Sequence, residues 1–281
     1  MPAPPPACRV RDIIDLMERI APARLAESWD NCGLQLGAAD WPVRSVWVAL
    51  DPLPEVVTAA CAAGADMLIT HHPLFMRAIK RLDLGSPGGR VVARAIGHRL
   101  AIFAAHTNFD SAAEGLNDIL ARRLEIDAAG ALQPPADDVM PGEGRFSGVG
   151  LGRIGDLRAP TTLAELARRI SATLALPGLR IAGPEQLDVS RVALCTGSGG
   201  RLVSAFLATT AQVYISGDLR YHDARDVVAA GRGLIDIGHF ASEHLMVQAL
   251  ADRLEKSLAA HGVAVTACSV ETDPLVWVTA D

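Results

Sequence analysis

The chain has 281 residues, of which half are hydrophobic and 4% are aromatic, and its formal net charge is −6. This size and composition are typical of a globular protein with one large domain or two modest ones, and they exclude a largely disordered chain. No apolar run approaches the roughly 20 residues that a membrane span requires. Duplex nucleic-acid binders usually present a basic face, and none is visible in this net negative sequence. We therefore expect neither a membrane nor a nucleic acid as partner.

Two further features predict a cytoplasmic protein. The first seven residues lack the basic start and the apolar core of a secretory signal. The five cysteines are an odd number without CxxC spacing, which argues against a disulfide scaffold or a zinc ribbon and fits a reducing compartment. We expect them to be small, buried or half-buried residues.

Strand and helix patterns alternate along the first half of the chain. Apolar residues at helical spacing predict helices, and short apolar runs bounded by turn residues predict strands. In chain order, we expect a helix over 10–20, a turn-rich stretch over 29–34, a strand over 45–50, a helix over 55–63, a strand over 66–70, a helix over 90–98, a strand over 100–104 and a helix over 112–124.

The second half repeats this alternation after a linker or surface excursion predicted over 131–145. We expect a strand over 149–157, a helix beginning near 162, a strand over 191–195, a helix over 202–208, a strand over 211–216, a helix over 222–230, a strand over 234–238, a long helix over 241–260 and a final strand pair over 263–267 and 275–278. This order predicts an α/β fold of two related lobes, residues 1–130 and 146–281, which together form one unit.

A pair of adjacent histidines, His71 and His72, follows the strand predicted over 66–70, and Pro73 ends that strand. Each imidazole needs a polar partner, so two together are difficult to bury in an apolar core. Neutral imidazole is a good ligand for zinc and its first-row neighbours, and the pair therefore indicates a metal site. Two surface histidines are the alternative.

A second pattern occurs once in each half: a carboxylate follows a histidine by four residues where a strand gives way to a helix. The pairs are His106 with Asp110 and His239 with Glu243. Residues four apart on a helix lie on one face, so His239 and Glu243 can converge on one ion. Sites in open α/β sheets form beyond the carboxyl ends of strands, where we expect the three histidine-bearing segments to meet.

Such a mixed set of imidazoles and carboxylates exceeds what one tetrahedral zinc needs and suits two ions about 3.5–4 Å apart. Open positions on the ions would acidify water for hydrolysis of a phosphate ester, an amide or a ring. For His106, three roles stay open: a ligand, a partner that orients a ligand, or a core histidine bonded to backbone. His222 fits substrate contact or a structural role better than metal binding.

Two glycine-rich stretches are candidates for phosphate-binding loops. Residues 150–155 match GxGxxG, but these glycines lie within a strand-like run and not between a strand and a helix, as the dinucleotide fingerprint requires. The loop 196–200 follows a strand and precedes a helix, so it could cradle an anion, although it lacks the lysine of a P-loop. We interpret it as a tight strand–helix turn.

Six short motifs together resemble one known family, over about Val10 to Val278. They are Trp29-Asp30-Asn31-x-Gly33-Leu34, Thr70-His71-His72-Pro73-Leu74, Ala105-His106-Thr107-Asn108-Phe109-Asp110, Gly150-x-Gly152-Arg153-x-Gly155, Ser216-Gly217-Asp218-x-x-Tyr221-His222 and Gly238-His239-x-x-x-Glu243. On these residues the chain resembles the NIF3-like family, whose members are often labelled GTP cyclohydrolase 1 type 2 homologues. The resemblance implies two related α/β lobes with a dinuclear metal site between them. The implied ligands are His71, His72, Asp110, His239 and Glu243, with His106 close by.

The resemblance also implies a toroidal homohexamer. The native metal stays open among zinc, manganese, iron and cobalt. Our first hypothesis is a metal-dependent hydrolase of a small phosphorylated or purine-like substrate, in which His106 or His222 could carry protons. Activity on GTP rests on the resemblance alone. The alternatives are a non-catalytic metal chaperone or insertion factor, and a ring-shaped scaffold whose metals brace the lobes.

Overall fold

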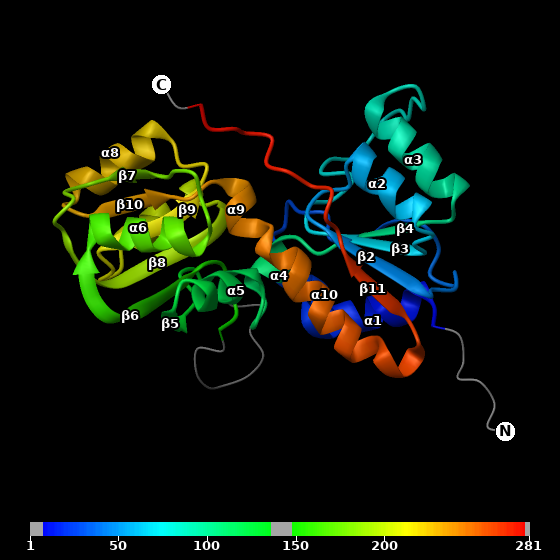
Figure 1. Cartoon of the computed structure of the whole chain (residues 1–281), viewed down its shortest axis with the longest axis horizontal. Helices are drawn as coiled ribbons and strands as arrows, with labels where there is room; N and C mark the ends of the chain where they lie inside the picture. The colour runs from blue at the N-terminus through cyan, green and yellow to red at the C-terminus, as the bar shows by residue number, and fades with distance from the viewer. Residues whose placement is uncertain (1–7, 136–147, 279–281) are drawn as a thin grey trace. The chain divides into compact units, whose positions relative to one another are not determined.

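The chain folds as two compact units, and the computed structural model describes residues 8–135 and 148–278 (Figure 1). The first unit comprises the residues up to Phe109 together with Met246–Thr272. The second comprises Asp110–Leu245 together with the residues from Asp273 onward. Each unit contains one β-sheet flanked by helices. The α/β architecture predicted from the alternation of strands and helices is confirmed.

These units differ from the lobes predicted over 1–130 and 146–281, because strand pairing joins segments that are distant in sequence. Strand β5 (Ile126–Gly130) pairs with β6 (Arg153–Thr162) of the second unit. Strand β11 (Ala264–Ala267) returns to the first unit and pairs with β2 (Ser45–Ala49). Most of the predicted linker, residues 136–145, lies outside the described residues.

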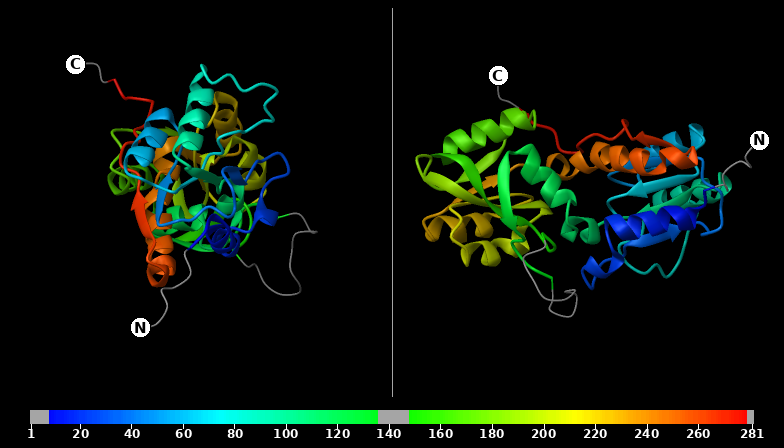
Figure 2. Two further views of the ribbon diagram at one scale, coloured as in Figure 1. Left: turned by 90° about the vertical axis from the view of Figure 1, so that its right-hand side faces the viewer. Right: turned by 90° about the horizontal axis from the view of Figure 1, so that it is seen from below.

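The sheet of the first unit has the strand order β1-β4-β3-β2-β11. Strand β1 is antiparallel to β4 and the other neighbours are parallel, so β2, β3 and β4 end at one edge of the sheet. Helices α1 and α10 cover one face, and α2 and α3 cover the other (Figures 1 and 2). The remaining bounds are α1 Val10–Ile20, η1 Ala23–Leu25, β1 Gly33–Leu36, α2 Pro54–Ala62, β3 Met67–Thr70, α3 Pro87–Gly97, β4 Ala101–Ala104, α10 Leu245–Leu258 and η4 Ala259–His261.

The sheet of the second unit has the strand order β5-β6-β8-β9-β10-β7. Its central strands β8, β9 and β10 are parallel, whereas β5, β6 and β7 pair in antiparallel fashion. Short helix α4 (Thr107–Ser111) leads from the first unit into the second. The remaining bounds are α5 Leu116–Arg123, α6 Leu163–Thr173, β7 Arg180–Ala182, β8 Asp188–Ser198, η3 Gly200–Leu202, α7 Val203–Leu207, β9 Val213–Gly217, α8 Tyr221–Ala229, β10 Gly233–Asp236 and α9 His239–Glu243.

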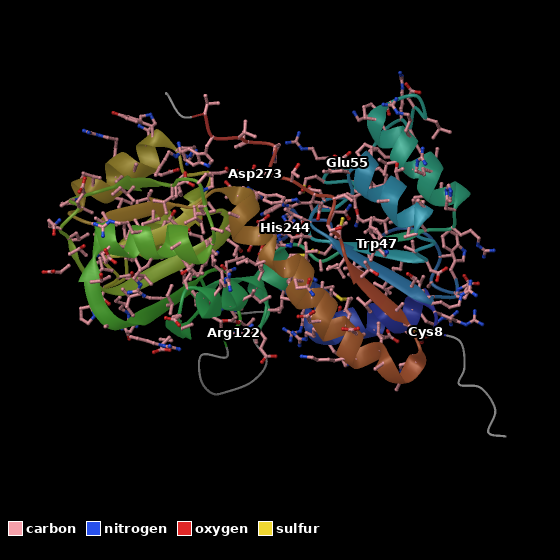
Figure 3. All side chains as sticks on the ribbon, in the orientation of Figure 1. Cys8, Trp47, Glu55, Arg122, His244 and Asp273 are labelled. Carbon is pink, nitrogen blue, oxygen red and sulfur yellow. The ribbon has the colours of Figure 1, made fainter. Side chains whose placement is uncertain are left out.

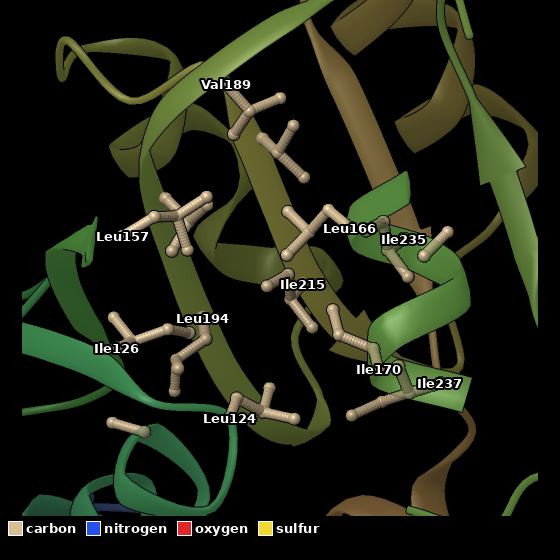
Figure 4. Packing of buried hydrophobic residues seen from close by; sticks show 14 of the residues in the cluster. Leu124, Ile126, Leu157, Leu166, Ile170, Val189, Leu194, Ile215, Ile235 and Ile237 are labelled. Carbon is tan, nitrogen blue, oxygen red and sulfur yellow. The ribbon is translucent and has the colours of Figure 1, made fainter. Parts of the chain in front are cut away.

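This second sheet is buried on both faces, because successive side chains of its central strands enter two different apolar clusters. Ile215 of β9 faces α6, where it joins Leu166 and Ile170 (Figure 4), and Val213 of the same strand belongs to the same cluster. Between them, Tyr214 faces the opposite way, into the cluster formed with η3, α7 and α8. The alternation follows from the two-residue period of a strand. Because the side chains on both faces of the sheet are buried in apolar clusters, the residues that are free to form a site are those beyond the strand ends.

Several predicted boundaries are wrong for identifiable reasons. Residues 275–278 form no strand, although the segment is apolar and β-branched; Leu275 and Val276 are 74% and 81% exposed. The helix predicted over 112–124 begins only at Leu116. The helix predicted over 241–260 is two helices, α9 and α10. Strands β1, β5 and β7 were not predicted, because they are short and lack a clear apolar alternation.

All five cysteines are free thiols, and four of them are buried. Figure 3 shows Cys8 just before α1 and Trp47 on β2 of the first unit. Within the described ranges, none of the helices has the length and apolarity needed to cross a bilayer.

The glycines of the GxGxxG match make room for a buried arginine. Gly150 and Gly152 have φ of +125° and +64°, and a side chain on either would collide with neighbouring backbone. Arg153, 1% exposed, donates to the carbonyls of both glycines at 2.8 and 2.7 Å and to both oxygens of Asp118 at 2.6 and 2.8 Å. No helix opens on the motif, since α6 begins at Leu163. The motif therefore has a structural role in the second unit, where its glycines accommodate Arg153.

Replacing Arg153 with Met should lower the free energy of unfolding by about 3–5 kcal/mol, because it leaves the half-buried Asp118 carboxylate and three backbone carbonyls without their donor. The matched control is Arg158→Met on the same strand. Its side chain is 66% exposed and lies 3.6 Å from Glu125, so it should change stability by less than about 1 kcal/mol. Urea denaturation of both variants checks this. Equal losses in the two variants would contradict the structural role.

Candidate metal centre

Three histidines of the first unit gather at one edge of its sheet. His71 and His72 follow β3, and His106 follows the adjacent parallel strand β4. Their ligand nitrogens all lie within 4.8 Å of one another, and their ring centroids are 5.1–5.6 Å apart. His71 is completely buried. Of the three histidine-bearing segments that we expected to meet beyond strand ends, the two of this unit therefore do so.

Hydrogen bonds at Nδ1 fix how the three imidazoles are oriented. Nδ1 of His71 bonds the carbonyl of Ala105 at 2.9 Å, and Nδ1 of His72 bonds Oδ1 of Asp51 at 2.8 Å. A carbonyl oxygen can only accept, so His71 carries its proton on Nδ1 and a lone pair on Nε2. A carboxylate favours the same tautomer. This is the arrangement by which proteins orient metal-binding histidines.

His106 is held by the most extensive of these networks. Its Nδ1 donates to Oδ1 of Asp30 at 2.8 Å, while Oδ2 of Asp30 accepts from the backbone of Thr107 and from the thiol of Cys32, both at 3.0 Å. Burial alone would raise the pKa of Asp30, but the bonds from His106, Cys32 and Thr107 outweigh it, and the pKa lies well below its usual range. Burial and the neighbouring Asp30 raise the pKa of the Cys32 thiol to about 12, so this thiol is an unreactive donor.

A half-buried carboxylate supports the loop that carries Asp51. Glu271 accepts hydrogen bonds from the backbone nitrogens of Leu50, at 2.9 and 3.0 Å, and of Asp51, at 2.8 Å. Burial raises the pKa of Glu271, and the backbone donors partly offset that effect. His72 is therefore positioned by Asp51, whose loop is in turn held by a residue more than 200 positions away in the sequence.

In the second unit, His239 and Glu243 lie one turn apart on α9. Nε2 of His239 is 2.9 Å from Oε2 of Glu243, so the prediction that the two residues share a helix face is confirmed. Nδ1 of His239 bonds Oδ2 of Asp218 at 2.9 Å. Asp218 follows β9 and has φ of +51°, a left-handed conformation that Asp tolerates better than most residues. As with His72 and His106 in the first unit, an aspartate oxygen bonds Nδ1 of the histidine.

Asp110 is held at the end of strand β8. Its Oδ1 accepts from the hydroxyl of Thr196 at 3.0 Å, and its backbone carbonyl accepts from the Asn117 side chain at 3.0 Å. Asn117 in turn accepts from the backbone nitrogen of Thr196 at 3.0 Å. All three residues are buried. Asp110 is thus a positioned side chain of the second unit and more than a helix-terminal carboxylate.

Glu243 fits its place only because Gly197 has no side chain. A Cβ at Gly197 would lie 2.0 Å from Oε1 of Glu243 and 3.5 Å from Cε1 of His239, and the φ of this glycine is +62°. Its backbone nitrogen donates to the hydroxyl of Ser242 at 2.8 Å. The glycine-rich loop 196–200 therefore receives side chains from α9 and is a close strand–helix turn, as interpreted from the sequence.

The donor chemistry of each unit suits a divalent ion. Imidazole nitrogen and carboxylate oxygen are ligands that zinc, manganese, iron and cobalt accept. The first unit offers three imidazoles that could hold an ion. In the second unit His239 and Glu243 are adjacent donors, and Asp110 lies against Thr196 of β8. His222 is exposed at the start of α8 and contacts the ring of Tyr221.

Sequence reasoning missed several residues that hold the candidate ligands. Asp51 follows β2, the neighbour of β3, and its position at a strand end was a usable signal. Asn117 and Thr196 gave none, because their roles depend on contacts between segments about 80 residues apart. Asp30 and Asp218 stood within recognised motifs, but neither was predicted to orient a histidine.

Replacing Gly197 with Ala should lower the free energy of unfolding by about 2 kcal/mol more than the same change at Gly231. Gly231 lies in the same unit with φ of +71° and has no atom within 4 Å of an added Cβ, so it isolates the backbone cost. The excess arises because the buried Glu243 must move. Guanidinium denaturation measures both variants. An equal cost at the two positions would show that Glu243 adjusts freely.

Replacing Asp30 with Asn should cost about 2 kcal/mol at pH 7 in metal-free protein, since a buried, multiply bonded carboxylate is lost. The folded-state pKa of Asp30 lies below its unfolded value, so its contribution is fully present above about pH 4 and is lost as the pH falls further. The difference between Asp30→Asn and wild type should therefore shrink below about pH 4. Denaturation from pH 3 to 7 checks this, with exposed Asp40→Asn as control. A difference that does not change with pH would be inconsistent with an ionised Asp30.

Comparison with known proteins identifies the family of the chain. The family model Duf34/NIF3 (NGG1p interacting factor 3) matches residues 8–274. A Streptomyces coelicolor protein named GTP cyclohydrolase 1 type 2 homolog is 35% identical over 95% of this chain and 93% of its own length. A Bacillus cereus protein related to NIF3 is 26% identical, with a TM-score of 0.89 over 97% of this chain and 99% of that chain. The Staphylococcus aureus protein SA1388 is 27% identical, with a TM-score of 0.87 over 96% and 99%. The resemblance noted in the motifs is confirmed, and the chain belongs to the Duf34/NIF3 family.

Proposed function

We propose that this protein binds two divalent metal ions through His71, His72, Asp110, His239 and Glu243 and hydrolyses a small phosphorylated or purine-like substrate with their help. The observation that carries the proposal is the shared environment of the histidines. Each has Nδ1 bonded to an oxygen acceptor, which leaves Nε2 as the metal-binding position, and in His239 that atom already faces Oε2 of Glu243 at 2.9 Å.

The number of donors supports two ions over one. Three imidazoles and two carboxylates exceed the four ligands of a structural zinc site, and two ions held by five residues would keep open coordination positions. Neither unit alone supplies the five residues, so the proposal requires donors from both units to serve the same pair of ions. A bound divalent ion supplies Lewis acidity, which polarises a phosphoryl or carbonyl oxygen and lowers the pKa of water.

His106 is the residue that we assign to proton transfer. Asp30 holds its Nδ1 proton, so Nε2 is the atom at which it can accept and return a proton. Exposed His222 is the alternative carrier. The name GTP cyclohydrolase 1 type 2 homolog, carried by the curated relatives, is consistent with a purine-like substrate.

Two further expectations belong to this proposal. We propose a ring-shaped homohexamer, which sedimentation velocity would test. We also propose a cytoplasmic location, which the five free thiols support.

Replacing Glu243 with Gln should remove at least one ion per chain and lower turnover at least about 100-fold, because the amide keeps the size of the carboxylate but loses its charge. The matched control is Glu185→Gln, an exposed residue of the same unit. Metal content is measured by mass spectrometry on protein purified without chelator. Turnover is measured on the same samples against a panel of phosphate esters and nucleotides.

Full turnover of a metal-free Glu243→Gln variant would contradict the hydrolase. A wild-type protein that binds and rapidly exchanges two ions but hydrolyses nothing in the panel would favour the metal chaperone instead. Replacing His71 or His72, in the other unit, tests whether the two donor sets serve the same ions. If they do, the loss of metal should resemble that of the Glu243 variant.

A further inference from the structure

The second unit contains a cavity of about 650 Å³ whose lining includes none of the proposed metal ligands. Its walls come from the loop before β7, from the residues that follow β9 and β10, and from the C-terminal segment from Asp273 to Trp277, all within this unit. The volume falls within the range of about 300–1,000 Å³ in which small-molecule sites occur.

One wall of the cavity is aromatic. The indole of Trp277 lies against Gly178, where an added Cβ would be 3.3 Å from Cζ3 of the ring. Leu176, Pro177 and Leu275 extend this apolar surface. Trp277 is 56% exposed although it belongs to an apolar segment, so the protein itself leaves much of the ring surface available. A large aromatic face beside a cavity is a feature of sites that bind organic cations or aromatic rings.

The formal charge of the lining residues favours an organic cation over a neutral aromatic ring. Three aspartates and one arginine line the cavity, which gives a formal charge of −2. Arg180 is paired with Asp236, whose carboxylate also accepts from the backbone of Gly238 at 3.0 Å. Asp273 accepts one hydrogen bond, from the backbone of Leu275 at 2.9 Å, and has no cationic partner among the described residues. Asp218 is the third carboxylate.

We propose that this cavity binds an organic ammonium ion with an aromatic or branched apolar body. The ammonium group would lie near Asp273 and Asp218, and the body would pack on Trp277. Cation–π attraction and the two carboxylates act in the same direction for such a ligand. The same carboxylates repel anions, so a phosphorylated substrate of the proposed function would not occupy the cavity. The ligand would adjoin the metal-binding residues, because Asp218 also bonds His239.

Three probes of nearly equal shape test the charge preference directly. They are 2-phenylethylamine, 2-phenylethanol and 3-phenylpropionate, titrated into full-length, chelator-treated protein in an amine-free buffer by calorimetry and tryptophan fluorescence. We expect the amine to bind at least about tenfold more tightly than the alcohol and the carboxylate not to bind measurably. An alcohol that binds as tightly as the amine, or an amine that does not bind at millimolar concentration, would overturn the proposal.

Variants locate the bound amine. Trp277→Ala should weaken amine binding about tenfold, and Asp273→Asn should weaken it about fivefold while leaving alcohol binding unchanged. The control is Val278→Ala, next in the chain, 90% exposed and outside the cavity lining, which should bind as the wild type does. Unchanged amine binding in both Trp277→Ala and Asp273→Asn would overturn the assignment. Because the titration uses metal-free protein, its outcome does not depend on whether the hydrolase proposal holds.

Discussion

The hydrogen bond at Nδ1 of each candidate histidine is the interaction on which the site depends. In His71 the acceptor is a backbone carbonyl, and in His72, His106 and His239 it is an aspartate. An imidazole with Nδ1 fixed in this way has one remaining nitrogen, and the direction of that nitrogen is set before any ion binds. The cost of ordering four rings is thereby met during folding, so it does not oppose metal binding.

Two of the acceptors directly follow strands of the sheets, which explains how a short motif can be held so firmly. Asp51 follows β2, next to the strand that carries His71 and His72, and Asp218 follows β9, next to the strand that precedes His239. Parallel strands end at a common edge, so a histidine after one strand finds its acceptor after the neighbouring strand. Both sheets place strand-end residues in this way, and both units have the same pairing of imidazole and carboxylate.

Much of this arrangement could be predicted from local sequence patterns. The first helix was predicted with the observed bounds, because its apolar spacing is regular. The contact of His239 with Glu243 followed from a spacing of four residues on one helix. The division of the chain could not be predicted in this way: the pairing of β11 with β2 joins residues more than 200 positions apart. The supporting roles of Thr196, Asn117 and Glu271 could not be predicted either, because their partners are distant in sequence. The apolar run 275–278 shows the converse limit, because a strand-like composition without a neighbouring strand gives no strand.

The most direct measurement is the NMR spectrum of the ¹⁵N-labelled histidines with and without a diamagnetic divalent ion such as zinc, assigned with single His→Gln variants. We expect His71 and His72 to carry the proton on Nδ1 in both states, and His239 to carry it there once an ion replaces the contact of its Nε2 with Glu243. On addition of the ion, we expect the Nε2 resonance of each to shift to a metal-bound position. Histidines that hold their proton on Nε2, or Nε2 resonances that do not respond to the ion, would contradict the account.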